Sequence, residues 1–212
     1  MPPTRVVVFI DYQNVQYTAR GLFWPEDPPP PRTAGHVDPV RFAELLCDLG
    51  RDRDPTRVLA GVRVYRGQPV AGRSRDNAVR FFDRQVAHWQ QEDTIELRSR
   101  PLRYHRAANP DGSEYWAGRE KGVDVMLALD ICVGARSNSY DIAVVASADT
   151  DLIPALEDAV SVGKWVETAT WQDPDQIRGP LRIRGFNLWN HYLDHSHFDL
   201  VRDDTDYLEP LP

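Results

Sequence analysis

The sequence predicts an α/β protein with three α/β/α layers around a central parallel sheet. Short apolar runs rich in β-branched residues, over residues 6–10 and 142–146, are typical of strands buried on both faces of such a sheet. Stretches with helical spacing alternate with these runs, which indicates right-handed β-α-β units. The 212 residues suffice for one sizeable core, so we expect a single domain over residues 1–212.

The elements follow one another in a regular alternation. Asp38 before Pro39 is typical of a helix start, and Ser74 is expected to cap a long amphipathic helix that ends near Gln91. The expected strands cover residues 6–10, 57–65, 94–102, 141–146 and 164–170. The expected helices cover residues 15–20, 39–49, 74–91, 120–135, 152–162 and, more weakly patterned, 186–192. Right-handed crossovers then predict the strand order 3-2-1-4-5, with the first and fourth strands adjacent.

Three segments lie outside this alternation. Residues 21–37 are rich in proline and are interpreted as a surface insertion. Phe23 and Trp24 are expected to pack this segment against the core, and stacking on a substrate base is the alternative. Residues 104–117 predict a hairpin-like excursion, because they contain the turn signal Asn-Pro-Asp-Gly. Residues 171–212 form a C-terminal extension with an acidic tail. The core is therefore expected over about residues 5–170.

Acidic residues follow the two strands that this order makes neighbours. Asp11 follows the first strand, and Asp149 and Asp151 follow the fourth. Asp124 lies in the first turns of the helix over residues 120–135. Since ligands bind outside the carboxyl ends of the strands in open α/β sheets, we expect the four carboxylates to meet in one pocket. Taken singly, each could be a helix cap or a solvated side chain.

Carboxylates that share a pocket repel one another unless protons or cations neutralise them. Oxygen ligands without histidine or cysteine favour Mg²⁺ or Mn²⁺. Two such ions about 4 Å apart can activate a water and stabilise the leaving oxygen in phosphodiester hydrolysis. Asn14 is expected to orient a water or a phosphate oxygen, and Ser147 and Thr150 offer hydroxyls at the same turn. Asp130, further along the helix, is interpreted as structural or as a support for the ligands.

Three ordered motifs resemble the NYN domain family, the PIN-like ribonucleases that include the LabA-type bacterial proteins. They are FIDYQN (residues 9–14), EKGVDVMLALD (residues 120–130) and SADTDLIP (residues 147–154). The resemblance covers about residues 5–170 and implies a PIN-like fold and a metal-dependent ribonuclease. It matches the family's acidic residues to Asp11, Asp124, Asp149 and Asp151, and the motif asparagine to Asn14. The family commonly has glycine where this chain has Ala148.

Basic residues near the site would have to hold the RNA backbone. Arginines interleaved with aromatic residues suit single-stranded or structured RNA, since guanidinium groups take phosphates and rings stack on bases. Lys121 lies close to the expected metal site. The first cluster comprises Arg98, Arg100, Arg103 and Arg106 with Tyr104 and His105, and a second comprises Arg178, Arg182 and Arg184. A solvated edge strand is the alternative interpretation of the first cluster.

Composition narrows the remaining possibilities. The formal net charge of −7 argues against non-specific, backbone-wide nucleic-acid binding but is compatible with a local basic patch. Cys47 and Cys132 lie in apolar, helix-like stretches, which is typical of reduced thiols. With no basic and apolar leader and no apolar run of spanning length, we expect a cytoplasmic protein without a membrane segment. A homo-oligomer is left open.

Other enzyme classes fit less well. A haloacid-dehalogenase-type phosphotransferase needs an aspartate where this chain has Gln13, and a Toprim-type site accounts for Asp149 and Asp151 but not for Asp11. The histidines of the HYLDHSH segment, His191, His195 and His197, have a zinc-compatible spacing but no fourth ligand in view. A catalytically weak or inactive NYN-fold regulator that binds RNA or protein is the main alternative.

Overall fold

The computed structural model describes residues 2–24, 30–31, 33–172 and 181–209. Its centre is a six-stranded sheet in which all neighbouring strands run parallel. The strands are β1 (Thr4–Asp11), β2 (Arg57–Gln68), β3 (Ile95–Pro101), β6 (Ile142–Ala146), β7 (Trp165–Trp171) and β8 (Trp189–Leu193). Their order across the sheet is β3-β2-β1-β6-β7-β8.

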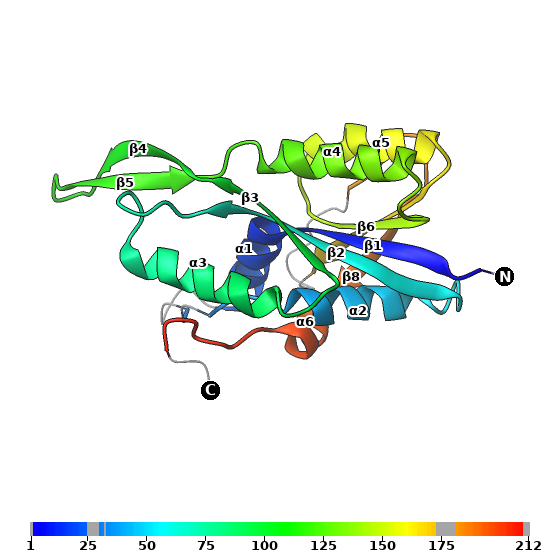
Figure 1. The fold of residues 1–212 in the computed structure, drawn as a ribbon, viewed down its shortest axis with the longest axis horizontal. Coiled ribbons are helices and arrows are strands. Elements are labelled where there is room, and N and C mark those ends of the chain that lie inside the picture. The colour runs from blue at the N-terminus through cyan, green and yellow to red at the C-terminus, as the bar shows by residue number, and fades with distance from the viewer. Residues whose placement is uncertain (1, 25–29, 32, 173–180, 210–212) are drawn as a thin grey trace.

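Helices cover both faces of the sheet, which confirms the α/β class (Figure 1). One face carries α1 (Tyr12–Phe23), α2 (Pro39–Gly50), α3 (Asp76–Trp89) and α6 (His195–Val201). The other carries α4 (Val123–Arg136) and α5 (Ile153–Ser161), the latter preceded by the 3₁₀ turn η1 (Thr150–Leu152). Among the described helices, none is both long and apolar enough to cross a membrane.

Side-chain alternation along β1 supplies both cores. Val6, Val8 and Ile10 point toward the α1 and α2 side, whereas Val7 and Phe9 point toward the α4 and α5 side. The central strand is therefore apolar without interruption, as expected of a strand covered on both faces. The two free cysteines lie on opposite sides of the sheet, Cys47 in the first core and Cys132 beside the second.

The predicted strand order 3-2-1-4-5 differs from the observed one. The strands expected as fourth and fifth are β6 and β7, because two hairpin strands intervene in the chain, and β8 adds a sixth strand beyond β7. The helix expected over residues 186–192 is wrong, since residues 189–193 pair with β7. The polar Asn190 interrupts the apolar pattern expected of a buried strand, so this strand was not recognised in the sequence. Its buried side chain bonds to Thr168 and Thr170, which only the neighbouring strand supplies.

The excursion expected over residues 104–117 is an antiparallel hairpin of β4 (Arg103–Ala108) and β5 (Glu114–Arg119). It is not part of the main sheet and projects from one end of the molecule (Figure 1). At its base the amide of Val70 donates to the hydroxyl of Tyr104, 3.1 Å away. The N-terminus of α4 follows β5 after a few residues, so the hairpin and that helix end are connected directly.

The ends of the proline-rich segment pack against the core. Phe23 contacts Trp171 and Phe198, with ring centroids 5.8 and 5.4 Å apart, and Trp24 lies 5.1 Å from Phe198. The packing role expected of both residues is confirmed, while residues 25–29 and 32 lie outside the described part.

The acidic tail also contributes to the core, because Asp203 is buried and accepts a hydrogen bond from Tyr207.

Candidate metal centre

The site begins where β1 and β6 end side by side. Ile10 pairs with Ala146, so Asp11, the last residue of β1, lies beside Ser147, the first residue after β6. The hydroxyl of Ser147 donates to Oδ2 of Asp11 at 3.0 Å. The sequence prediction that the first strand and the strand before Asp149 are neighbours is confirmed.

Hydrogen bonds hold the turn after β6 in one shape. The amide of Asp149 donates to Oγ of Ser147 at 3.1 Å, and the amide of Asp151 donates to Oδ1 of Asp149 at 3.0 Å. The amide of Ala148 donates to Oδ1 of Asn14 at 3.2 Å. Asn14 therefore links the start of α1 to this turn. The water or phosphate contact expected of Asn14 stays a prediction, and the structure adds that its side chain fixes the position of the turn after β6.

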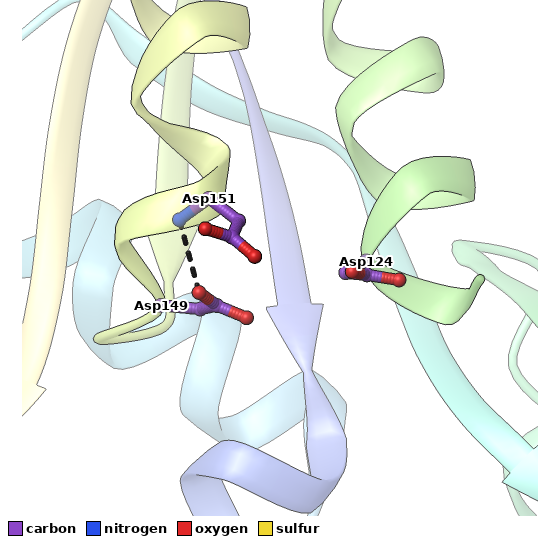
Figure 2. Close-up of side chains that lie close together, drawn as sticks. All are labelled: Asp124, Asp149 and Asp151. Atoms are coloured by element: carbon purple, nitrogen blue, oxygen red, sulfur yellow. Dashed lines mark hydrogen bonds between the residues drawn. The ribbon is translucent and has the colours of Figure 1, made fainter. Parts of the chain in front are cut away.

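Three carboxylates converge from α4 and this turn. Asp124, Asp149 and Asp151 each place one oxygen so that the three atoms lie within 4.8 Å of one another. Figure 2 shows Asp124 in the first turn of α4, facing Asp149 and Asp151 across the gap between the elements. Gly122, with φ of 76°, immediately precedes the helix and sets its direction. Asp151 is exposed, and the other two carboxylates are partly buried.

Asp11 is not one of the three residues whose oxygens lie within 4.8 Å of one another, but it is close enough to Asp149 and Asp124 for their charges to act on it. Burial raises the pKa of Asp11 to about 6. Hydrogen bonds from the amide of Asn14 and the hydroxyl of Ser147 oppose this shift, and the charges of Asp149 and Asp124 add to it. Asp11, Asp124, Asp149 and Asp151 are called the aspartate cluster below.

The aspartate cluster opens into a cavity of about 690 Å³. Asp11, Asp124 and Asp149 line it together with Lys121. The cavity is also lined by residues to which the sequence analysis gave no role in the site, namely Gln13, Tyr17, Thr18, Arg119 and Glu120. Glu120 lies within the EKGVD motif, and its proximity to Lys121 and Asp124 in the chain was the signal that could have identified it.

Glu120 adds a further acidic group to this cavity. Burial raises its pKa, a hydrogen bond from the amide of Gly67 opposes the shift, and the charge of Asp11 adds to it. The bond to Gly67 ties the segment before α4 to the end of β2. Glu120 therefore helps to hold the N-terminus of α4 beside the carboxyl ends of the strands.

The arginines expected to bind substrate occupy different environments. Arg98 forms ion pairs with Glu96 and Asp130, and Tyr65 donates to Asp130 as well, which favours structural roles for Arg98 and Asp130. Arg100 lies close to Gly122: a Cβ built on that glycine would be 3.7 Å from its guanidinium.

The other basic residues are spread over two regions. Arg103 is exposed at the base of the hairpin, whereas Arg106 pairs with Glu114 further along it. Arg182 and Arg184 line a separate cavity beside β8, and Arg178 lies outside the described residues. Arg182 and Arg184 therefore lie apart from the aspartate cluster. Thr150, exposed in η1, lies next to Asp149.

The histidines of the HYLDHSH segment do not share one helix. His191 is buried in β8, with Nε2 2.9 Å from Glu167, whereas His195 and His197 belong to α6. The helical zinc chelate weighed from the sequence is wrong, because the chain changes from strand to helix between these residues.

The aspartate cluster has the composition of a site for a hard divalent cation. The three residues that could hold an ion together, Asp124, Asp149 and Asp151, offer only carboxylate oxygens, which suits Mg²⁺ or Mn²⁺. Among the ion pairs between residues that the structure describes, none involves Asp11, Asp124, Asp149 or Asp151. No lysine or arginine among the described residues therefore lies within ion-pair distance of these carboxylates, and Lys121 and Arg119 contribute positive charge only from elsewhere in the cavity lining. The residues present fit a metal centre.

Comparisons with known proteins identify the family of this chain. One solved structure that matches is the crystal structure of a protein of unknown function, VPA0982, from Vibrio parahaemolyticus RIMD 2210633. The match has 18% sequence identity and a TM-score of 0.47 and covers 79% of this chain and 81% of that one. No curated protein matches. The NYN domain family profile matches residues 5–182, which is most of the chain, and the protein is therefore a member of the NYN domain family.

Proposed function

We propose that this protein is a metal-dependent ribonuclease that hydrolyses RNA phosphodiester bonds at the aspartate cluster. One observation carries the proposal: carboxylates from the first turn of α4 and the turn after β6 converge beside the carboxylate at the end of β1, and none of them forms an ion pair with a described basic side chain. Membership of the NYN family, whose domains are PIN-like and of nuclease type, supports the same conclusion. RNA is the substrate class that this membership favours.

Asp124, Asp149 and Asp151 would hold Mg²⁺ or Mn²⁺, with Asp11 as a further ligand. When bound, such ions supply Lewis-acid stabilisation of the phosphate and lower the pKa of a water. Asn14 and Ser147 keep Asp11 and Asp149 at a constant separation through their hydrogen bonds.

Basic and polar groups around the aspartate cluster would bind the scissile phosphate. Lys121 lines the cavity, and Arg100 lies beside Gly122 at the start of α4. The hydroxyl of Thr150 is at the edge of the same turn as Asp149. The N-terminus of α4 faces this region, and its positive end favours anions. The phosphate would thus be held between the helix end and the metal ligands.

The test is cleavage of a fluorescent, mixed-sequence RNA. We expect cleavage with Mn²⁺ or Mg²⁺ and none in EDTA. Asp149→Asn and Asp11→Asn should each lower the rate by more than about 100-fold, since supporting residues alone contribute 10- to 100-fold in metal sites. Asp130→Asn is the matched control, because this carboxylate lies on the same helix as Asp124 but bonds to Tyr65 and Arg98.

Two outcomes would contradict the proposal. If wild-type protein binds RNA but does not cleave it with either ion, and Asp149→Asn binds equally well, the chain is an RNA-binding regulator that keeps the fold. If Asp130→Asn loses as much activity as Asp149→Asn at unchanged melting temperature, the aspartate cluster is not the reaction centre. Circular dichroism of every variant separates both outcomes from misfolding.

A further inference from the structure

The hairpin of β4 and β5 has two unlike faces. Because successive side chains of a strand point to opposite sides, the pair Tyr104 and Gly118 shares one face and the pair Arg103 and Arg119 shares the other. The base of the Tyr104 face is covered by the protein itself. Tyr104 contacts Ser74 and the amide of Val70, so this face fastens the hairpin to the loop before α3.

The face with Tyr104, Arg106, Trp116 and Gly118 is called the fastened face below, and two arginines contact its tryptophan. The guanidinium carbon of Arg73 lies 4.5 Å from the ring centroid of Trp116, and that of Arg106 lies 4.8 Å from the same ring. Arg106 also pairs with Glu114. The cations of this face are therefore engaged with an aromatic ring and a carboxylate.

The opposite face is called the free face. Following the pairing of β4 and β5, it consists of Arg103, His105, Ala107, Tyr115, Ala117 and Arg119. Arg103, His105, Tyr115 and Arg119 are exposed, and the ring of Tyr115 is flanked by alanines rather than by larger side chains. The free face thus offers two cations and an accessible ring on a surface without bulky obstruction.

Arg103 and Arg119 form a like-charge pair across the two strands. They are direct partners in the register, an arrangement that destabilises a hairpin when nothing neutralises it. Neither residue takes part in an ion pair among the residues that the structure describes. Two arginines opposite each other at the base of a projecting ribbon are suited to an external polyanion, whose phosphates would supply the missing countercharge.

The free face leads directly to the aspartate cluster. Arg119 lines the same cavity as Asp11, Asp124 and Asp149, and Lys121 follows it two residues later. The chain then enters α4 at Gly122, beside Arg100. Positive charge therefore extends from the hairpin to the edge of the negative cluster.

We propose that the free face binds single-stranded RNA and guides it to the aspartate cluster. Arg103 and Arg119 take backbone phosphates, and Tyr115 stacks on a base. A duplex is a poorer fit, because its bases are stacked on one another and unavailable to a tyrosine ring. This inference rests on the proposed function for the fate of the strand, but the binding itself requires neither metal nor catalysis.

The test is binding of a fluorescent 20-nucleotide single-stranded RNA in EDTA, followed by fluorescence anisotropy. Arg103→Gln combined with Arg119→Gln should weaken binding at least about tenfold. The plot of log K against log salt should become shallower by about 1.4, since each single-strand phosphate contact contributes about 0.7. Tyr115→Ala should weaken binding by about 5- to 150-fold, the range for loss of one stacked base.

The matched control is Arg73→Gln combined with Arg106→Gln. It removes the same charge from the fastened face and should retain the salt dependence of the wild type. A duplex of the same length should bind at least about tenfold more weakly. Equal weakening by both double variants, unchanged binding by Arg103→Gln with Arg119→Gln, or preference for the duplex would each overturn the inference. If the protein bound another protein but neither of the two RNAs, the inference would also be overturned.

Cleavage measurements separate this inference from the proposed function. If wild-type protein never cleaves RNA but loses binding when Arg103 and Arg119 are changed, the ribonuclease proposal fails and the binding face stands. If it cleaves with metal while that double variant binds and cleaves normally, only the binding face fails. Asp149→Asn should bind the RNA in EDTA as tightly as the wild type.

Discussion

Replacing Asp11 with asparagine removes one buried negative charge beside Asp124 and Asp149 while keeping the size of the side chain. In the metal-free protein this charge is costly, because burial raises the pKa of Asp11 from 3.8 to about 6. A carboxyl group whose pKa is higher in the folded state stabilises the fold below its unfolded pKa. That contribution is lost as the pH rises through the folded pKa.

The magnitude follows from the two pKa values. A difference from 3.8 to about 6 corresponds to about 3 kcal/mol at pH 8. Asparagine keeps one acceptor for the amide of Asn14 but cannot reproduce both oxygens, a loss of about 1 kcal/mol. Asp11→Asn should therefore increase the free energy of unfolding by about 2 kcal/mol at pH 8. At pH 4 the charge benefit falls to about 0.5 kcal/mol, and the variant should be no more stable than the wild type.

Urea unfolding in EDTA, at several pH values between 4 and 8, measures this difference. His36 titrates in the same pH range but changes the stability in the opposite direction. Burial lowers its pKa from 6.5 to about 4, so its contribution to the free energy of unfolding is lost as the pH falls below 6.5. Both proteins contain His36, so its effect cancels in the difference. A variant less stable than the wild type at pH 8, or a difference that does not change with pH, would refute the reasoning.

Three further substitutions test other parts of the structure. Gly122→Ala should lower the free energy of unfolding by about 1–2 kcal/mol, because the backbone angle φ of Gly122 is 76°, and it should also lower the rate of RNA cleavage. The control is Gly163→Ala, where φ is 83° and the space around the glycine is open. It should lower the free energy of unfolding by the same amount without loss of activity. Glu167→Gln should destabilise the protein by about 3–5 kcal/mol in urea unfolding, since buried Arg57 loses its carboxylate; a loss under about 1 kcal/mol would contradict this. Asn14→Ala should cost about 1 kcal/mol by leaving the amide of Ala148 unpaired and reduce cleavage at least about tenfold at saturating RNA; unchanged cleavage would show that the turn holds its shape without Asn14.

The local pattern of the chain determined the central elements of this protein. The apolar runs of β1 and β6 can be recognised because a strand covered on both faces leaves no place for polar residues. The alternation of strands and helices then makes parallel crossovers the available topology. These two inferences together predicted that Asp11 and the turn carrying Asp149 lie at one edge of the sheet, as the bond between Ser147 and Asp11 shows.

Other features depended on contacts between residues far apart in the chain. The residues of β8 do not have a strand pattern in the sequence, because one of its buried positions is the polar Asn190. Asn190 can be buried there only because Thr168 and Thr170 of β7 form hydrogen bonds with it. Arg98 is basic in the sequence, but Glu96 and Asp130 engage its charge.

The two faces of the hairpin show most clearly which features cannot be predicted from the sequence. Alternation assigns Tyr104 and Arg103 to opposite sides but cannot say which side the rest of the protein covers. Only the tertiary structure places the loop before α3 against Tyr104 and leaves Arg119 facing the cavity. Whether a charge is neutralised or available to a ligand is decided by the neighbours that folding brings, because electrostatic interactions act through space and not along the chain.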